Sequence, residues 1–340
     1  MNKIVITGGA GFIGSHVAEK MAEVYPDAEI HILDKMTYAA DFENISHLLK
    51  RGQRCLCVGD VCDFEFCRRV TKDADLILHL AAESHVDNSF GNSFCFTQSN
   101  TLGTHTLLEA ARVNEVPKFI HVSTDEVYGE IRTGFHKETD FLNPTNPYSA
   151  SKAAGDMIVN SYTRSFKLPI ISVRANNIYG IRQFPEKLIP RFALLGLLGL
   201  KFTVHGDGSH SRRFLAAQDF AEGLLLLVRK GEIGEIYNIG SDSEYTILQV
   251  LEMISARLGI EASTMTEFVN DRPFNDCRYA IDSSKLLALG WKPRTSFESH
   301  LSEVIEWYKQ NMRRYRHLFD DSPPLASVSS GSTRSQTFEV

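Results

Sequence analysis

The stretch that decides the expected fold is KIVITGGAGFIGSHVAEKM, residues 3–21. A β-branched run predicts a buried strand, and an apolar helical pattern follows it. Between them, GGAGFIG places glycines at three positions of a turn. Gly8 permits the tight turn, Gly11 lets backbone amides approach a pyrophosphate, and Gly14 allows the helix to pack closely on the strand. The stretch therefore predicts a unit that binds a dinucleotide.

A carboxylate at the end of the second predicted strand, Glu29 to Leu33, strengthens this interpretation. Asp34 follows that strand twenty residues after Gly14, where it would hold the ribose hydroxyls of adenosine. The same carboxylate would repel a 2′-phosphate, so we expect NAD rather than NADP, although the adjacent Lys35 weakens the discrimination. The alternative is that Asp34 only caps a helix.

Two further predicted strands, Arg54 to Val58 and Leu76 to Leu80, also end in residues suited to a cofactor. Asp60 could meet the adenine amino group, and the small Ala81 and Ala82 would let a ribose lie against backbone at a strand end. The predicted cofactor site comprises Gly8, Gly11, Phe12, Ile13, Gly14, Asp34, Lys35, Thr37, Asp60, Val61, Leu80, Ala81, Ala82, Ser84, Asn100, Tyr148 and Lys152.

Strands and helices alternate through residues 1–176, which predicts a right-handed, doubly wound parallel sheet of the Rossmann-like α/β class. Part of 215–240 is expected to complete this domain. Residues 177–318 mix helices, short strands and turns, and we expect a smaller, interleaved α/β substrate domain there. The tail, 322–340, is poor in large apolar residues and is predicted to be disordered. The longest predicted helices span residues 92–114 and 297–315.

Composition indicates an ordinary globular protein, with 43% hydrophobic residues and a net charge of −6. That charge argues against a nucleic-acid or membrane surface. No apolar run approaches the length of a membrane span, and a strand at the very start leaves no room for a signal peptide. The six cysteines lack the paired ligand sets of a zinc site, so we expect no metal and reduced thiols in a cytoplasmic protein. We expect Cys62 and Cys67 to pack on a helix.

Two consecutive carboxylates end the predicted strand from Phe119 to Ser123. After Thr124 come Asp125 and Glu126, and each carboxylate would resist leaving water if it were buried. Costly buried carboxylates are candidates for chemistry. The alternative is that Asp125 caps a helix and Glu126 faces solvent.

A tyrosine and a lysine lie four residues apart on the helix expected after Pro147. Tyr148 and Lys152 therefore project from one face, and an ammonium there would favour tyrosinate. With Lys152 and the positive ring of the cofactor lowering its pKa, Tyr148 could remove a hydroxyl proton while the neighbouring carbon gives hydride to NAD, and Thr124 would hold the same hydroxyl. This much predicts the oxidation of an alcohol.

The acidic pair Asp125 and Glu126 suggests a longer reaction sequence. Oxidation of a sugar hydroxyl to a ketone acidifies the neighbouring carbon, which a carboxylate can deprotonate. A second carboxyl group can protonate a hydroxyl leaving from the next carbon, and hydride can then return to that carbon. Such a sequence of oxidation, elimination and reduction needs one group ionised and the other protonated.

GGAGFIG together with YSASK resembles the extended short-chain dehydrogenase/reductase family. STDEVYG, NPYSASKA, QFPEKLIP and NDRPFNDCRYAID together resemble the nucleotide-sugar 4,6-dehydratases, and the resemblance extends over about residues 3–312. HVDNSFGNSF, GTHTLLEA and RPFND are most similar to eukaryotic UDP-glucose 4,6-dehydratases, including the first domain of plant rhamnose synthases. The dTDP-glucose enzymes are close behind.

The resemblance implies an NAD-dependent lyase in which Tyr148 is the base for the C4 hydroxyl, Glu126 the base at C5 and Asp125 the acid for the C6 hydroxyl. It also implies a homodimer that pairs through the helices near Thr101 and Lys152. The implied contacts to the nucleotide sugar are Ser84, Thr124, Asn177, Glu186, Lys187, Leu188, Arg212, Asn238, Arg272 and Asn275.

Two departures from the family pattern concern the substrate contacts. After the GDG turn the chain has RRFLAAQDF, so Arg213, Ala216 and Ala217 replace an acidic residue, a tyrosine and a valine. Asn275 also stands where many bacterial relatives have histidine. Cations in the turns of this half can simply solvate the surface, but we expect them to clamp a diphosphate, because guanidinium forks match phosphate oxygens. They are Lys187, Arg191, Arg212, Arg213, Arg272 and Arg278.

Three alternative functions share this fold. A nucleotide-sugar 4-epimerase would use Tyr148 but would need no acid and base at C5 and C6. A UDP-glucuronate decarboxylase would give Asp125 no proton to transfer. A non-catalytic NAD-sensing protein would need none of these side chains. Whether the nucleobase is uracil or thymine stays open, since one methyl group is worth only about 1–3 kcal/mol in a pocket.

Overall fold

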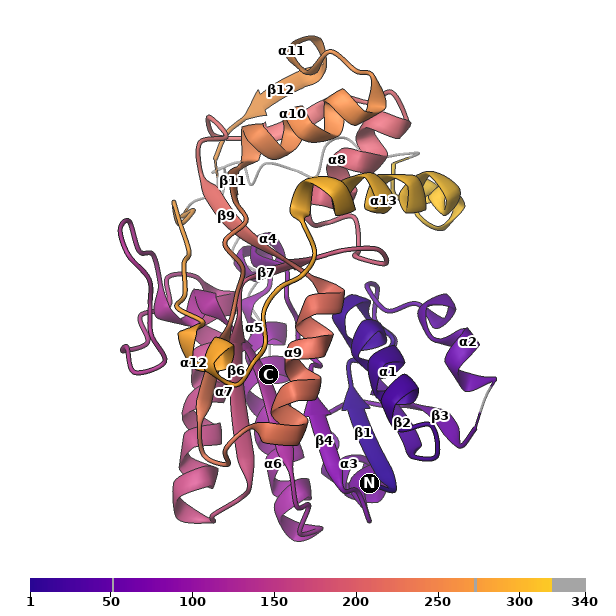
Figure 1. Ribbon diagram of the computed structural model, residues 1–340, viewed down its shortest axis with the longest axis vertical. Helices are drawn as coiled ribbons and strands as arrows, with labels where there is room; N and C mark the ends of the chain where they lie inside the picture. Colours follow the sequence, from indigo (N-terminus) through magenta and orange to yellow (C-terminus); the bar gives the residue numbers. More distant parts are fainter. Residues whose placement is uncertain (51, 272–273, 320–340) are drawn as a thin grey trace, which may run out of the picture.

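The structure is a computed structural model that describes residues 1–50, 52–271 and 274–319, and Figure 1 shows it as two lobes. One lobe is built on a large sheet with helices against it, and the smaller lobe lies above the carboxyl ends of the strands. The predicted disorder of the tail and the predicted role of Arg272 lie outside the described residues.

The large lobe contains a seven-stranded sheet in which every neighbouring pair is parallel. The strand order is β10-β6-β5-β4-β1-β2-β3, so the chain winds outward from β1 in both directions. This confirms the predicted doubly wound sheet, whose switch point at β1 is the usual position of a ligand. The strands are β1 Lys3–Thr7, β2 Glu29–Asp34, β3 Arg54–Val58, β4 Leu76–His79, β5 Phe119–Thr124, β6 Ile170–Ala175 and β10 Ile236–Ile239.

Helices cover both faces of this sheet. On one face α1 and α9 lie side by side and pack on Ile4 and Ile6 of β1, whereas Val5 between them packs with α3, α6 and α7 on the other face. Because alternate residues are buried on opposite faces, the strands are apolar almost throughout. The helices are α1 Phe12–Val24, α3 Phe64–Thr71, α6 Gly103–Val113, α7 Pro147–Ser165 and α9 Ala217–Lys230.

The smaller lobe has its own core, in which Phe192, Phe202, Phe297 and Tyr308 are fully buried. It contains a sheet of order β11-β9-β7 and a pair formed by β12 and β8. Its elements are β7 Asn177–Tyr179, α8 Leu188–Leu197, β8 Phe202–His205, β9 Ser211–Ala216, β11 Glu244–Thr246, α10 Ile247–Leu258, α11 Ala262–Met265, β12 Thr266–Val269 and α13 Phe297–Gln310. The chain crosses back to the large sheet between β9 and β11, where it forms α9 and β10.

Three helix predictions need correction. The helix expected over 92–114 consists of α5 Ser93–Phe96, a π-helical turn at Thr97–Leu102, and α6. Cys62 precedes α3, so of the two cysteines only the buried Cys67 lies on that helix. The last long helix ends at Gln310, and short 3₁₀ turns follow at Met312–Arg314 and Arg316–Leu318. The remaining short elements are α2 Ser46–Leu49, α4 Val86–Gly91, α12 Ser284–Ala288 and 3₁₀ turns at Phe42–Asn44 and Asp125–Tyr128.

Within the described part of the chain, no helix combines the length and the apolar character that crossing a membrane requires.

Candidate active site

A continuous cavity lies at the carboxyl ends of the central strands and is lined by both lobes. At one end the glycine turn between β1 and α1 forms its wall, and at the other end the lining comes from the segments around Arg212 and Asn275. Between these ends lie the acidic pair after β5 and the start of α7. The cavity thus spans every region in which the sequence predicted chemistry.

The glycine turn has a conformation that side chains would disrupt. Gly8 has a φ of +69°, and a Cβ added to Gly14 would lie 2.1 Å from the carbonyl oxygen of Gly8. Helix α1 then starts at Phe12, and its N-cap residue Gly11 makes no side-chain cap. The first backbone N–H groups of α1 therefore have no side-chain acceptor at the cap and lie at the positive end of the helix dipole, which suits a pyrophosphate.

Asp34 ends β2 beside this turn and is buried. Its carboxylate accepts hydrogen bonds from the backbone N–H of Ala10 at 3.0 Å and of Met36 at 2.9 Å, and it caps no helix. Burial raises the pKa of Asp34. The neighbouring Lys35 forms an ion pair with Asp60, with Nζ and Oδ2 2.7 Å apart. Because that ammonium is already paired, it offers little to a 2′-phosphate, and the preference expected for NAD is strengthened.

All but one of the residues predicted for the cofactor line this cavity. The exception is Asn100, which is buried behind the wall. Its side chain donates to the carbonyl of Glu83 and to Ser151 Oγ and accepts from the N–H of Glu83, each at 2.9 Å. Asn100 thus fixes Glu83, which does line the cavity, and a direct contact of Asn100 with the cofactor stays a prediction.

Thr124, Asp125 and Glu126 are buried at the end of β5, and all three line the cavity. Thr124 caps the following 3₁₀ turn: its Oγ1 accepts from the N–H of Glu126 at 3.3 Å and donates to Asp125 Oδ1 at 3.2 Å. Asn176 donates to the other oxygen of Asp125 at 2.7 Å. The alternative in which Asp125 is a cap and Glu126 faces solvent is therefore wrong.

Burial shifts both carboxyl groups of this pair toward the protonated state. Burial, with the charge of Glu126, raises the pKa of Asp125 to about 7, against the opposing hydrogen bonds from Asn176 and Thr124. Burial also raises the pKa of Glu126, and the nearby charges of Lys187 and Arg212 oppose the shift. Near neutral pH, Asp125 can therefore carry a proton, while Lys187 and Arg212 limit the rise in the pKa of Glu126. An acid and a base need such a difference between their surroundings.

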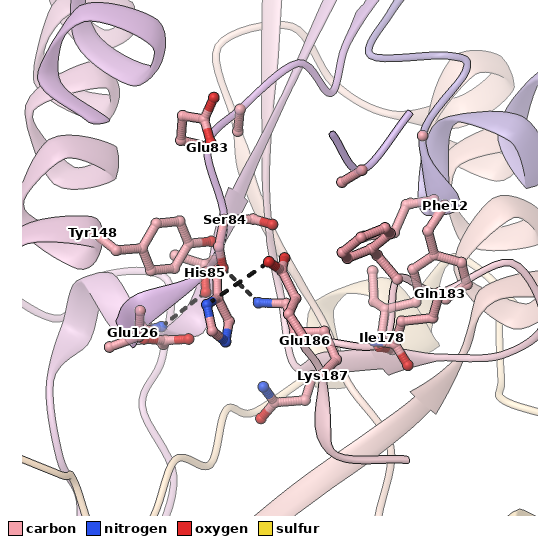
Figure 2. A pocket seen from close by; sticks show the side chains of 18 of the residues that line it. Phe12, Glu83, Ser84, His85, Glu126, Tyr148, Ile178, Gln183, Glu186 and Lys187 are labelled. Carbon is pink, nitrogen blue, oxygen red and sulfur yellow. Dashed lines mark hydrogen bonds and ion pairs between the residues drawn. The ribbon is translucent and has the colours of Figure 1, made fainter. Parts of the chain in front are cut away.

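Tyr148 and Lys152 lie on one face of α7, as the spacing predicted. The helix begins with a capping box in which Asn146 Oδ1 accepts from the N–H of Ser149 at 2.9 Å. This cap fixes the first turn, and Figure 2 shows the Tyr148 ring facing the same space as Glu126. Lys152 donates from Nζ to the carbonyl oxygen of Val122 at 2.8 Å.

The expected activation of Tyr148 is not present in the free chain. Burial, with the charges of Glu126 and Asp125, raises the pKa of Tyr148 instead of lowering it. Burial also lowers the pKa of Lys152 to about 8. The physical reason is that desolvation and two nearby carboxylates outweigh the one ammonium, which is held by the Val122 carbonyl. A tyrosine base here needs further positive charge.

A cluster of charged residues lies across the cavity from Tyr148. Lys187 donates from Nζ to the carbonyl oxygen of Ser84 at 2.5 Å, and His85 Nδ1 lies 3.7 Å from Glu186 Oε2 (Figure 2). Ser84, Glu186 and Lys187 were predicted, whereas His85 was not. The sequence feature that could have indicated His85 as a site residue is its position in the segment that follows the end of β4.

The far end of the cavity contains Arg212 and Asn275, both predicted. Arg212 donates to Asn275 Oδ1 at 3.1 Å and lies over the Tyr279 ring, 5.0 Å from its centroid. Asn177 and Leu188 also line the cavity, and Asn177 Oδ1 is a buried acceptor with no hydrogen-bond partner in the described chain. Such an acceptor suits a donor from a ligand. Gln183 also lines the cavity, and its Oε1 is another buried acceptor without a hydrogen-bond partner in the described chain. The sequence did not indicate Gln183 as a site residue.

Asn238 was predicted to contact the substrate but does not line the cavity. It is fully buried, accepts from the hydroxyl of Tyr128 at 3.0 Å and donates to the carbonyl of His136 at 3.2 Å. Its place on β10 puts it at the edge of the large sheet, where it supports Tyr128. Asn238 is therefore a structural residue.

The cations expected to clamp a diphosphate divide into two groups. Lys187 and Arg212 line the cavity. Arg213 and Arg278 do not; they share Glu244, with nitrogen–oxygen distances of 3.0 and 2.6 Å. Arg191 is mostly buried and donates to Thr203 at 3.4 Å. Arg213, which departs from the family pattern, thus forms an ion pair with Glu244. Ala216 and Ala217, the other replaced positions, are buried in the cores.

Asn176 and Asn146 are further side chains that sequence reasoning missed as site residues. Asn176 holds Asp125, and Asn146 Nδ2 lies 3.5 Å from Glu126 Oε2. For Asn146 the signal was a good N-cap residue immediately before Pro147. For Asn176 it was a position directly after β6, which adjoins β5 in the sheet.

Comparisons with known proteins agree with this geometry. The family model described as GDP-mannose 4,6 dehydratase matches residues 5–304. A trifunctional UDP-glucose 4,6-dehydratase/epimerase/reductase of Arabidopsis thaliana is 46% identical over 315 residues, which cover 91% of this chain and 47% of that protein. The chain therefore spans about half the length of that relative. The human dTDP-D-glucose 4,6-dehydratase is 39% identical over 323 residues, covering 93% of this chain and 92% of that protein.

Solved structures give the same picture. The dTDP-glucose 4,6-dehydratase of Streptomyces venezuelae, solved with NAD bound, superposes with a TM-score of 0.90 at 37% identity and covers 93% of this chain and 99% of that chain. A UDP-glucose 4-epimerase of Thermotoga maritima has a TM-score of 0.84 at 27% identity, covering 91% and 99%. The backbone is thus common to dehydratases and epimerases, and the side chains of the site must distinguish them.

Proposed function

This chain belongs to the GDP-mannose 4,6 dehydratase family, and we propose that it is an NAD-dependent hydro-lyase acting on a nucleoside-diphosphate glucose. The substrate is UDP-glucose or dTDP-glucose and the product is the 4-keto-6-deoxy sugar, a step toward deoxysugars such as rhamnose. The observation that carries the proposal is the buried pair Asp125 and Glu126, which lies in one cavity with Tyr148.

The residues at the glycine turn fit NAD. The position of Gly14 admits no Cβ, and the carboxylate of Asp34 stands at the end of β2 with the nearby Lys35 already paired to Asp60. A carboxylate without a free cation suits ribose hydroxyls and disfavours a 2′-phosphate. When bound, NAD supplies a positively charged ring that takes a hydride from C4 and later returns it to C6.

Tyr148, Lys152 and Thr124 serve the oxidation at C4. Tyr148 takes the proton of the C4 hydroxyl, and Thr124 positions that hydroxyl from the end of β5. The raised pKa of Tyr148 makes tyrosinate scarce in the free chain. The reaction therefore needs the ammonium of Lys152, one helical turn away, together with the positive charge that the oxidised cofactor brings.

Glu126 and Asp125 then carry out the elimination of water. The new C4 ketone acidifies C5, and ionised Glu126 removes the C5 proton. Protonated Asp125 gives its proton to the C6 hydroxyl, which leaves as water. Glu126 then returns its proton to C5 as C6 is reduced. Tyr148 holds the proton of the C4 hydroxyl and Asp125 has given up its own, so proton exchange through solvent resets both groups, and the net change is the loss of one water. Asn176 holds Asp125 in place at 2.7 Å through these steps.

None of the alternative functions requires the acid–base pair Asp125 and Glu126. A 4-epimerase oxidises and reduces C4 only, and a decarboxylase loses a carboxylate that needs no proton from Asp125. A protein that only senses NAD would gain nothing from burying two carboxyl groups, because their desolvation costs stability. The dehydratase is the candidate that uses both carboxyl groups of this pair.

The test uses purified protein with UDP-glucose and with dTDP-glucose deuterated at C4. We expect a product that has lost one water, shows the base-induced absorbance of a keto sugar, and carries the deuterium at C6. Glu126→Gln should remove this activity, whereas Glu267→Gln, an exposed glutamate on β12, should not. A product that differs only in configuration at C4 would contradict the proposal. Parallel kinetics with the two nucleotides identify the nucleobase.

We also propose that the chain acts as a cytoplasmic homodimer through α6 and α7. These helices pack together, and apolar side chains around them are exposed: Leu102 is 49% and Met157 56% exposed. All six cysteines are unpaired, which suits a reducing compartment. Light scattering should give twice the chain mass, and Met157→Glu should give monomers. A wild-type protein that is monomeric at micromolar concentration would contradict the dimer.

A further inference from the structure

Three side chains of types that bind metals meet on β2 and β3 of the large sheet, and none of the three lines the cavity. In the parallel pairing of β2 and β3, His31 lies opposite Cys55, and Cys57 is two residues further along β3. Residues two apart on a strand share a face. One ligand atom from each side chain lies within 4.8 Å of the others, and the two sulfur atoms are 3.8 Å apart.

We propose that His31, Cys55 and Cys57 bind a thiolate-preferring divalent metal ion of the zinc class. Two sulfur atoms bound tetrahedrally at 2.3 Å from zinc are about 3.8 Å apart, the distance that Cys55 and Cys57 already have. A zinc-bound nitrogen lies about 3.6 Å from each sulfur at ideal angles, and the imidazole nitrogen lies within 4.8 Å of both sulfur atoms. The two sulfur atoms thus have the spacing that zinc requires, and the imidazole must move closer by up to about 1.2 Å.

A disulfide is the competing outcome for these two thiols. It requires the sulfur atoms at about 2.05 Å and Cα atoms no more than about 6.8 Å apart. Residues two apart in an extended strand have Cα atoms about 6.6 Å apart, near that limit. Forming the bond would strain β3 and would also need an oxidant. Metal binding needs neither, since it only replaces two thiol protons.

The surroundings of the cluster prepare the imidazole as a ligand. Glu29 Oε2 lies 3.5 Å from His31 Nε2, where the carboxylate can orient the imidazole. Cys55 is exposed and gives the metal a path from solvent. With three protein ligands, the fourth position of a tetrahedral ion stays open to water.

The position of the site gives it a structural consequence. β3 is the edge strand of the sheet and pairs with β2 alone. An ion held by His31 on β2 and by both cysteines on β3 would link the two strands at their outer face. The proposal does not rest on the dehydratase function, since none of the three residues lines the cavity.

The test is metal titration of the full chain, stripped with chelator and kept under reductant. We expect one Zn²⁺ per chain by competition with a chromogenic chelator, and a cobalt form with thiolate charge-transfer and tetrahedral d–d bands. Zinc should also raise the thermal midpoint. Cys55→Ser should weaken binding on the order of 100-fold and remove both the cobalt bands and the thermal shift. Cys277→Ser, which changes another exposed cysteine, should leave all three unchanged.

Several results would overturn the proposal. The first is an equal affinity for zinc in the wild type and in Cys55→Ser. The second is a cobalt spectrum of the wild type without thiolate bands. The third is a cobalt spectrum of His31→Gln that is identical to that of the wild type. The His31→Gln variant also covers the case in which Cys55→Ser fails to fold. Rapid formation of a Cys55–Cys57 disulfide in air, with no zinc binding under reductant, would identify a redox pair instead.

Discussion

The substitution Asp125→Asn should slow catalysis and, at high pH, raise the stability of the folded chain. It therefore distinguishes the catalytic role of this carboxyl group from its effect on stability. The amide keeps the size of the side chain, and its oxygen can still accept from Asn176, which donates at 2.7 Å in the wild type. The amide nitrogen can donate to the hydroxyl of Thr124, 3.2 Å from the present carboxylate oxygen. The substitution therefore removes one titratable proton and keeps both hydrogen-bond partners, although the bond with Thr124 reverses its direction.

The effect on stability follows from the pKa of Asp125. Burial raises it from 3.8 to about 7, so the folded chain holds this proton more tightly than the unfolded chain. The wild type therefore loses stability as pH rises from about 4 to about 7, by up to about 4 kcal/mol at about 1.4 kcal/mol per pKa unit. The variant lacks this titration. It should match the wild type near pH 4 and be more stable at pH 8 by up to about 4 kcal/mol.

The effect on catalysis has the opposite sign. Without a proton for the C6 hydroxyl, elimination should slow by about 10²–10⁴-fold. Oxidation at C4 should persist, because Tyr148 and Lys152 are unchanged. Stopped-flow absorbance should show the reduced nicotinamide accumulating in the variant, while urea unfolding at pH 4 and pH 8 measures the stability difference.

Two outcomes would refute this reasoning. If C4 oxidation falls as much as elimination, Asp125 is not the acid. If the variant is no more stable than the wild type at pH 8, the carboxyl group is not held near neutrality by burial. Asp27→Asn removes an exposed carboxylate that does not line the cavity and serves as the control, with an expected change within about 0.5 kcal/mol.

Other substitutions test the support of the site. Arg174→Met removes the 2.9 Å ion pair of buried Asp156 and leaves it with His121 Nε2 at 3.1 Å, so urea unfolding should show a loss of about 3–5 kcal/mol. Arg132→Ala, in an exposed ion pair, should cost far less, and similar losses would contradict the buried-pair argument. Gly14→Ala should abolish retention of NAD, measured on the purified protein, because its Cβ meets a carbonyl oxygen at 2.1 Å; a variant that retains NAD would show that the turn can relax. Lys152→Met should slow single-turnover hydride transfer by about 100-fold or more, and an unchanged rate would remove it from the oxidation.

Much of the fold was predictable because its signals are local. The turn of GGAGFIG, the strand ending in Asp34 and the alternation of strands and helices depend on residues close together in sequence, and the parallel sheet confirms them. The co-location of Asp125, Glu126 and Tyr148 also followed from the sequence, since the carboxyl ends of parallel strands meet at one edge. Their catalytic roles stay predictions.

The failures concern residues whose role depends on a distant partner. Asn238 was predicted to contact substrate, but Tyr128 occupies its side chain. Arg213 was predicted to meet a diphosphate, but Glu244 pairs with it across β9 and β11. Residue type and spacing are the same in either role, so the sequence could not distinguish them.

The sequence by itself determined which chemical groups are present and which strand or helix carries each one, because backbone periodicity and turn geometry are set over a few residues. Only the tertiary structure decided how those groups behave. It raised the pKa of Tyr148 against the expected effect of Lys152 and brought His31 to Cys55 and Cys57 without any recognised metal motif. Desolvation and partner choice depend on segments packed from far along the chain, and these are what tertiary folding supplies.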